Sequence, residues 1–170
     1  KLAFDIIENV TDGLVWFEEV ELNEKPDIVV QGVSPTKLEN IINESFNESV
    51  SADGIAGMAL PGNNSKIVFN GTIYYQPTRT AAYESNWFYG RCINFPSVEV
   101  HELLHIFGFM HTNTTVDHIM YPLYEPCKNN QVNEEVIDCL KWIYSNKEIG
   151  GRCNESNINP YYKNMSIMFD

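Results

Sequence analysis

The feature that most constrains this chain is the string His-Glu-Leu-Leu-His-Ile-Phe-Gly-Phe-Met-His at residues 101–111, which holds three of its four histidines. Because an α-helix turns once every ~3.6 residues, His101 and His105 project from one helix face and can bind the same metal ion. Gly108 can adopt a positive φ angle and end the helix, so that His111 returns as a third ligand. Three neutral imidazoles leave one tetrahedral position of Zn²⁺ open, which is the pattern of catalytic rather than structural zinc sites.

An amphipathic core helix that carries histidines at i and i+4 by chance is the alternative interpretation of this string. The glycine, the third histidine and a following methionine, Met120, all stand at fixed offsets, and this combination favours the metal site. Glu102 stands beside the first histidine, where its carboxylate can accept a proton from a water at the metal. We therefore predict Glu102 to be the catalytic residue.

The same string resembles the signature of the metzincin metallopeptidases, in which it is followed by a Met-turn. Residues 119–124, Ile-Met-Tyr-Pro-Leu-Tyr, resemble the Met-Tyr-Pro-x-Tyr pattern of one metzincin group, the matrixins. The resemblance implies that Met120 forms a hydrophobic base beneath the metal, and that Pro122 to Tyr124 form the outer wall of a substrate pocket. Thr112 stands where matrixins usually carry Ser. Because Pro122 occupies the place of the tyrosine that can reach zinc in astacins and serralysins, we expect no tyrosine ligand.

Residues 54–62, Gly-Ile-Ala-Gly-Met-Ala-Leu-Pro-Gly, resemble the matrixin edge strand that runs above the zinc and holds substrate. An edge strand has unpaired N–H and C=O groups, so an extended peptide can add to it as a further strand. We therefore expect Gly57, Met58 and Ala59 to bind substrate. An ordinary loop or hairpin arm rich in Gly and Ala is the alternative.

The resemblance implies one catalytic zinc ion and departs from the family elsewhere. The matrixin structural zinc needs further histidines, one of them near Met58, and only His118 remains, so we expect no structural zinc. Residues 70–72, Asn-Gly-Thr, replace the acidic stretch that often binds calcium, which leaves calcium binding open. We interpret His118 as a surface residue, or as a residue that supports the zinc ligands from behind.

The resemblance implies an α+β fold of the zincin type. Its parts are a twisted mixed sheet with an antiparallel edge strand, an active-site helix, and a small C-terminal subdomain with one helix. The length of 170 residues fits one catalytic domain, residues 1–170, with the subdomains divided after residue 111.

Hydrophobic periodicity and capping signals place the individual elements. Helices are expected at residues 1–9, from about 96, and from an N-cap at 133 to 150–151, with a short helix or ordered loop at 38–53. Strands are expected at residues 14–21, 27–32 and 66–75, in addition to the edge strand. The second of these carries a near-continuous Ile-Val-Val run, which is typical of a buried parallel strand. The family has a strand before the first helix that this sequence lacks, so we expect residues 164–169 to fill its place.

Cysteines and glycosylation sequons indicate an exported protein. Four cysteines are best explained as two disulfides of open pairing, because histidines already supply the metal ligands; they are Cys92, Cys127, Cys139 and Cys153. Eight Asn-x-Ser/Thr sequons occur where random order gives roughly two; they start at Asn9, Asn43, Asn47, Asn63, Asn70, Asn113, Asn154 and Asn164. We expect an extracellular or cell-surface glycoprotein, in a mature or truncated form without signal peptide. An Asn-rich chain without glycans is the alternative.

Charge and hydropathy bound the partners. The net charge of −12, with no basic stripe, argues against nucleic-acid binding, and no apolar run approaches the ~18 residues of a membrane span. The sequence therefore predicts a monomeric zinc endopeptidase of polypeptide substrates with Glu102 as general base. The alternatives are a catalytically quiet metzincin fold that serves as a binding module, against which the intact Glu102 speaks, and a zinc amidase of cell-wall peptides.

Overall fold

The computed structural model describes residues 1–47, 51–52, 55–62, 70–77, 95–123, 128 and 130–145. The described part has an α+β fold, which confirms the expected fold class. Its helices are α1 (Leu2–Val10), α2 (Pro35–Phe46), α4 (Ser97–Ile106) and α5 (Glu134–Tyr144), with a 3₁₀ helix η1 (Leu22–Glu24). Its strands are β1 (Ile28–Gly32), β2 (Gly57–Pro61) and β3 (Gly71–Tyr75). The division into subdomains after residue 111 stays a prediction.

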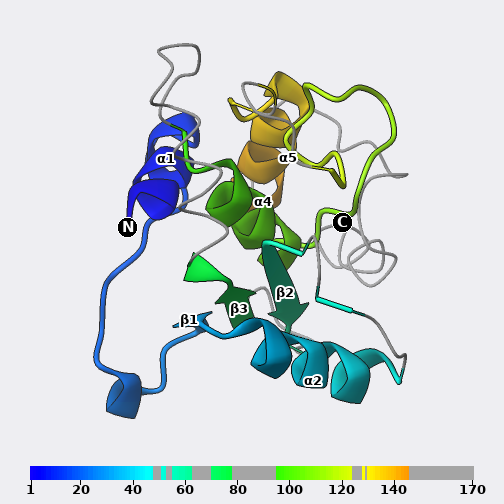
Figure 1. The fold of residues 1–170 in the computed structure, drawn as a ribbon. Helices are drawn as coiled ribbons and strands as arrows, with labels where there is room; N and C mark the ends of the chain where they lie inside the picture. Colours follow the sequence, from blue (N-terminus) through cyan, green and yellow to red (C-terminus); the bar gives the residue numbers. More distant parts are fainter. Residues whose placement is uncertain are drawn as a thin grey trace.

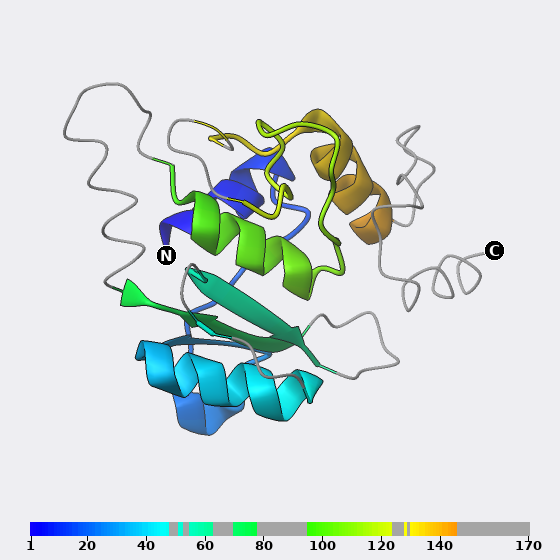
Figure 2. The same cartoon turned by 45° about the vertical axis from the view of Figure 1, so that its right-hand side comes forward.

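The elements are stacked in layers around α4. Figures 1 and 2 show α2 on one face of the sheet and α4 on the other, with α1 and α5 on the far side of α4. Covered from both sides, α4 is the centre of the main hydrophobic core, and it places the histidine string there. The most deeply buried members of this core are Ile7, Val100, Leu103, Leu104, Ile106, Ile119, Met120, Cys139 and Leu140.

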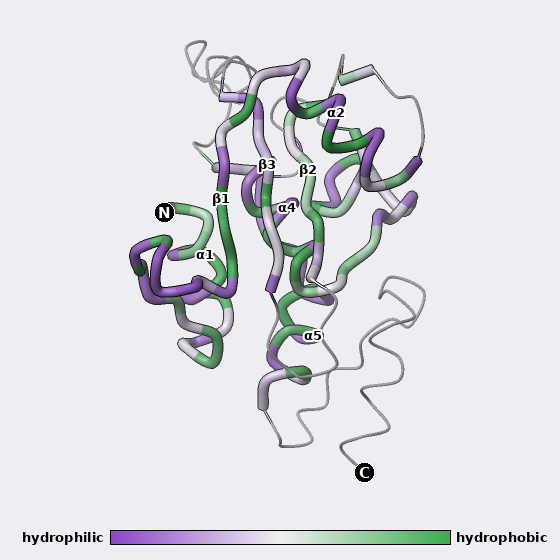
Figure 3. Tube along the Cα trace, turned by 90° about the horizontal axis from the view of Figure 1, so that it is seen from below, coloured by the Kyte–Doolittle hydropathy of each residue, from purple (hydrophilic) through white to green (hydrophobic). Residues whose placement is uncertain are grey.

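The sheet has the strand order β1-β3-β2 (Figure 3), with β1 parallel and β2 antiparallel to β3. Among the described strands β2 lies at one edge, so the predicted antiparallel edge strand is confirmed. A Cβ atom on Gly71 would lie 2.5 Å from the carbonyl oxygen of Leu60 and 2.6 Å from Cδ1 of Ile106. Glycine at this position therefore lets α4 and β2 approach β3 closely. The predicted strand at 66–75 is confirmed from residue 71, and residues 66–69 lie outside the described part.

The predicted strand at residues 14–21 is wrong. This segment runs without a ladder partner among the described residues and leads into η1. Its alternation has another cause: Val15 is buried and the ring of Phe17 packs 4.8 Å from that of Phe4, whereas Trp16 is 69% exposed. One-sided packing of an extended segment against helix α1 produces the same period of two as a strand does.

The expectation that the strand at 27–32 is buried is also wrong. β1 confirms the strand, and Figure 3 shows its hydrophobic run, but Ile28 and Val29 are only half-buried and Val30 is 45% exposed. Within the described sheet β1 has one neighbour, β3, so an apolar run here does not mean burial on both faces. The segment proposed to fill a further strand, residues 164–169, lies outside the described part.

The helix signals proved more reliable than the strand signals. α2 begins where Ser34 Oγ accepts the N–H of Lys37 and Pro35 takes the first helical position, a standard N-terminal pattern. It covers much of the 38–53 stretch that was expected to be a short helix or ordered loop. α5 begins after Asn133 as predicted, but it ends at Tyr144 rather than at residues 150–151.

Candidate metal centre

Helix α4 and the turn that ends it bring the three histidines together. His101 and His105 lie one turn apart on α4, which ends at Ile106. Gly108 has a φ of 90°, and the N–H of Phe109 donates to the carbonyl of Leu104. This glycine turn sends the chain back so that His111 faces the other two, as the spacing predicts.

The Nε2 atoms of the three histidines lie at the corners of a small triangle. They are 3.0 Å apart between His101 and His105, 3.1 Å between His101 and His111, and 3.2 Å between His105 and His111. In a tetrahedral site with Zn–N distances of about 2.0–2.1 Å, ligand nitrogens are about 3.3–3.4 Å apart. The triangle therefore fits a single Zn²⁺ ion after only a small expansion.

The hydrogen bonds of the ring nitrogens fix which of them can bind a metal. Nδ1 of His101 donates to the carbonyl oxygen of Ile119 at 2.6 Å, and Nδ1 of His105 donates to that of Phe109 at 2.7 Å. Because a carbonyl can only accept, the proton of each neutral ring lies on Nδ1 and the lone pair on Nε2. Lone pairs that face one another at 3.0 Å repel, and a shared cation removes that repulsion.

Burial keeps these rings neutral. Burial, together with the nearby His105, lowers the pKa of His101 from 6.5 to about 3, against the opposing hydrogen bond to Ile119. Burial also lowers the pKa of His105 to about 4, and it lowers the pKa of His111. At neutral pH all three offer the uncharged imidazole that a metal requires.

Glu102 lies beneath the edge strand. Its side chain is 6% exposed, and a Cβ atom on Gly57 would lie 2.9 Å from its Cγ and 3.0 Å from its Oε1. Burial raises the pKa of Glu102 from 4.5 to about 8, while a hydrogen bond from the backbone N–H of Ala59 opposes this rise. Two of the three residues expected to bind substrate, Gly57 and Ala59, thus also form the immediate surroundings of Glu102. Sequence reasoning missed this contact.

An open cleft passes over the histidines and connects the predicted site residues. Strand β2 contributes Gly57, Met58 and Ala59 to its lining. Helix α4 and its turn contribute His101, Glu102, His105 and His111, and Pro122 also lines the cleft. Met58 also packs toward α2, on the face of the sheet away from α4. Met120 lies behind the cleft and is 1% exposed. Tyr124 lies outside the described residues.

The structure reveals contacts near the site that the sequence did not predict. Phe46, at the end of α2, lines the same cleft and is 54% exposed, and no motif marks it. The interpretation of His118 as a surface residue is wrong, because His118 is only 4% exposed and its Nδ1 accepts the N–H of Met120. Asn133 accepts the N–H of Ile119 at 2.8 Å. Sequence reasoning gave Asn133 only the role of a helix cap.

In the part of the chain that the structure describes, the three histidines are the one group of at least three His, Cys, Asp or Glu side chains placed to hold a metal ion. A three-histidine centre on a helix ended by glycine, below an antiparallel edge strand, defines a metallopeptidase of the metzincin type. The family model of the matrixins matches residues 1–145, and the chain belongs to the matrixin family. No curated protein and no solved structure matches the chain. None of the described helices is both long and apolar enough to cross a membrane.

Proposed function

We propose that this matrixin is a zinc endopeptidase that cleaves polypeptides bound in extended form along β2, with Glu102 as the general base. The observation that carries the proposal is the buried carboxyl group of Glu102 in the same open cleft as the three converging Nε2 atoms. A binding module needs no carboxylate at this position. A hydrolase needs one, because the attacking water must lose a proton.

The three imidazoles would hold the metal, and a Zn²⁺ ion bound there supplies a Lewis acid that polarises the scissile carbonyl and acidifies a water. Glu102 accepts the proton of that water on its carboxylate and delivers it to the leaving amine. The burial that raises its pKa to about 8 makes its carboxylate a strong proton acceptor, and a cation on the histidines shifts the pKa back toward neutral pH. A value near the working pH suits a group that takes up and releases a proton in one cycle.

The substrate is held by the edge of the sheet. Among the described strands β2 pairs only with β3, so its outer backbone groups, apart from the N–H of Ala59 that donates to Glu102, are available to an extended peptide. Gly57 and Ala59 leave room for that peptide, and Pro122 and Leu123 line the same cleft. Phe46, Met110 and Leu123, which are 54%, 45% and 64% exposed, add apolar surface to the cleft. This surface favours apolar substrate side chains.

The test is a map of the cuts in a mixed peptide library, read by mass spectrometry. The wild type is expected to cut internal bonds, and Glu102→Gln to lose about 10²–10⁴-fold in rate at equal zinc content. Glu134→Gln makes the same change on the exposed first turn of α5, outside the cleft, and keeps activity. His105→Ala loses the metal as well as the activity. Retained cleavage by Glu102→Gln would contradict the role of Glu102.

Zinc-loaded wild-type protein that cuts no peptide would overturn the endopeptidase proposal. Cell-wall peptides added to the same assay then separate the remaining functions. Their cleavage indicates an amidase, and their survival indicates a binding module.

We propose further that the protein is monomeric, exported and glycosylated. Of its sequons, Asn9, Asn47 and Asn113 are exposed, with Asn9 inside helix α1 and the other two outside the helices, whereas the side-chain oxygen of Asn70 is buried. Cys139 on α5 is not a free thiol, and the other three cysteines lie outside the described residues, so the two-disulfide pairing stays a prediction. Glycosidase treatment of the protein from a eukaryotic host is expected to lower its mass, with glycan on Asn47 and Asn113 but not on Asn70.

A further inference from the structure

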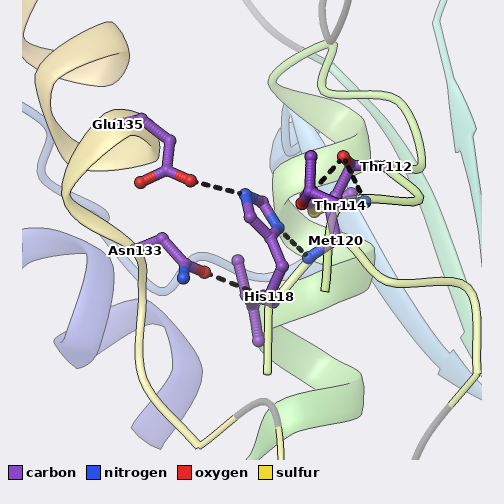
Figure 4. A network of polar contacts seen from close by, with 7 residues as sticks. Thr112, Thr114, His118, Met120, Asn133 and Glu135 are labelled. Carbon is purple, nitrogen blue, oxygen red and sulfur yellow. Dashed lines mark hydrogen bonds and ion pairs between the residues drawn. The ribbon is translucent and has the colours of Figure 1, made fainter. Parts of the chain in front are cut away.

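We propose that the first turn of α5 is a positioning element of the metal centre, acting on His101 through a chain of His118 and one peptide unit of the Met-turn. The chain runs from Glu135 to His118, then across the Ile119–Met120 peptide to His101 (Figure 4 shows the α5 side). The kinetic readout of this inference rests on the proposed function. Its metal-binding readouts do not.

The ligand side of the chain uses the carbonyl groups of the Met-turn. The carbonyl oxygen of Ile119 accepts the Nδ1–H of His101 at 2.6 Å. The carbonyl oxygen of Met120 accepts the N–H of Thr112 at 3.0 Å, directly after the ligand His111. Both carbonyls of the turn are therefore committed to holding the metal ligands or the residue beside one.

The α5 side of the chain uses the N–H groups of the same two residues. The N–H of Ile119 donates to Oδ1 of Asn133 at 2.8 Å, and the N–H of Met120 donates to Nδ1 of His118 at 3.0 Å. Because Nδ1 of His118 accepts, its proton lies on Nε2, which lies 3.0 Å from Oε1 of Glu135 and faces that carboxylate. In Figure 4 the side chains of Glu135 and Asn133 reach from the start of α5 toward this turn.

The decisive link is one planar group. The C=O of Ile119 and the N–H of Met120 belong to the same peptide unit, whose atoms lie in one plane with the two groups pointing in opposite directions. A hydrogen bond that fixes the N–H toward His118 therefore also fixes the direction of the C=O that orients His101. Ile119 and Met120 are each 1% exposed, so water does not replace a lost partner there.

The polarity of the chain is consistent from end to end. Every donor points away from the metal and toward Glu135, whose side chain is 56% exposed and ends the chain with a carboxylate. Aligned hydrogen bonds polarise one another, and electron density pushed toward a histidine ligand makes it a better ligand. Glu135 therefore influences Nε2 of His101 although it lies outside the cleft.

Asn133 supplies a second, independent sign that α5 serves the turn. Asn at an N-cap normally accepts an N–H of its own helix, yet Asn133 makes no such capping bond. Its side-chain oxygen accepts the N–H of Ile119 instead. Helix α5 therefore lacks the side-chain capping bond that commonly stabilises a helix start, and Asn133 holds the Met-turn instead.

The test compares variants along this chain by three measurements: the zinc dissociation constant by chelator competition, the absorption bands of the Co²⁺-loaded protein, and the melting temperature of the metal-free protein. His118→Leu is expected to weaken zinc binding about 10–100-fold and to shift the Co²⁺ bands. His118→Asn, which keeps an acceptor near the position of Nδ1, recovers most of this loss. Glu135→Gln weakens zinc binding less, because it removes the charge and keeps an acceptor.

Glu134→Gln is the matched control, since it makes the same change one residue away on the same exposed turn and is expected to leave zinc affinity and the Co²⁺ bands unchanged. If His118→Leu does not fold, Asn133→Ala against Asn133→Asp repeats the comparison. Unchanged zinc affinity in His118→Leu and Glu135→Gln would overturn the inference. So would an unchanged Co²⁺ spectrum with a loss of affinity that merely follows the metal-free melting temperature.

The kinetic arm uses the best peptide from the cleavage map. Because His118 lies behind the ligands and not in the cleft, His118→Leu is expected to lower kcat while KM stays within about two-fold. A raised KM with unchanged kcat contradicts a positioning role. If no variant or wild type cleaves peptides but the affinity and Co²⁺ changes appear, the proposed function fails and the positioning role stands.

Discussion

At the residue scale, Glu102 combines a charge-bearing group with a site that disfavours charge. Its pKa is raised by burial to about 8, so the metal-free folded protein holds a proton there that the unfolded chain releases above about pH 4.5. The stabilising contribution of the protonated form is fully present below pH 4.5 and is lost as the pH rises through 8. Rising pH therefore destabilises the metal-free fold through this residue.

Glu102→Gln, which imitates the protonated group, is expected to remove this dependence. The difference in unfolding free energy between the variant and the wild type grows in favour of the variant from about pH 5 to about pH 8. The slope is about 1.4 kcal/mol for every pH unit over which the folded and unfolded states differ by this proton. Urea unfolding in the presence of chelator measures it, and a flat difference would contradict the raised pKa.

Gly57 decides how closely the edge strand can approach Glu102. A side chain at this position meets Cγ of Glu102 at 2.9 Å. Gly57→Val suits a strand and is expected to keep the fold and the zinc, while it displaces the carboxyl group and lowers kcat by about ten-fold or more. Steady-state kinetics with zinc analysis check this, and wild-type kcat in a zinc-loaded Gly57→Val would show that Glu102 does not depend on this contact.

At the scale of elements, α4 and its terminating turn are the unit that creates the metal centre. Gly108→Ala forces a non-glycine residue into a φ of 90°, which costs roughly 1–2 kcal/mol and disturbs the return of His111. Gly13→Ala is the matched control, because Gly13 also has a positive φ, 74°, with no atom within 4 Å of an added Cβ. Both variants are expected to melt earlier when metal-free, but only Gly108→Ala weakens zinc binding. Equal zinc affinities of the Gly108→Ala and Gly13→Ala variants would show that metal binding does not depend on the turn at Gly108.

The elements that the sequence predicted well are those whose signals are local. The i, i+4 histidines, Gly108 and the start of α5 depend on spacing and capping within a few residues, and the structure confirms them. The strand expected at 14–21 was wrong because strand pairing depends on a distant partner. The alternating pattern at Val15 and Phe17 indicates which side of the segment is buried, but it does not indicate whether a strand or a helix covers that side.

The same distinction applies inside the candidate site. The histidine triangle follows from one helix and one turn. The contacts of Glu102 with β2, and those of Asn133 and His118 with the Met-turn, join segments whose meeting only the three-dimensional fold determines. The sequence therefore indicated the three histidines and Glu102, to which we assign the roles of metal ligands and base, but not the groups that surround them.

At the scale of the whole molecule, a metal ion bound to His101, His105 and His111 is expected to stabilise the fold, because it binds the folded chain and not the unfolded one. A ligand at 1,000 times its dissociation constant adds about 4.1 kcal/mol, which for a protein of this size raises the melting temperature on the order of 10 °C. Scanning calorimetry with zinc and after chelation measures the shift. Readdition of zinc is expected to reverse it, and His105→Ala to abolish it. Equal melting temperatures with and without zinc would argue against metal binding at the triangle.

The residues proposed to bind and hold the metal come from one part of the chain, and the residues that surround Glu102 come from another. His101, His105 and His111, the Met-turn, and the α5 residues that hold it all fall in one continuous stretch that ends at Glu135. The surroundings of Glu102 come instead from β2, far earlier in the chain. Recombination between relatives that exchanged this stretch as a block would transmit metal affinity intact. Catalytic turnover would be kept only if Glu102 of the exchanged stretch also fitted against strand β2 of the protein that receives it.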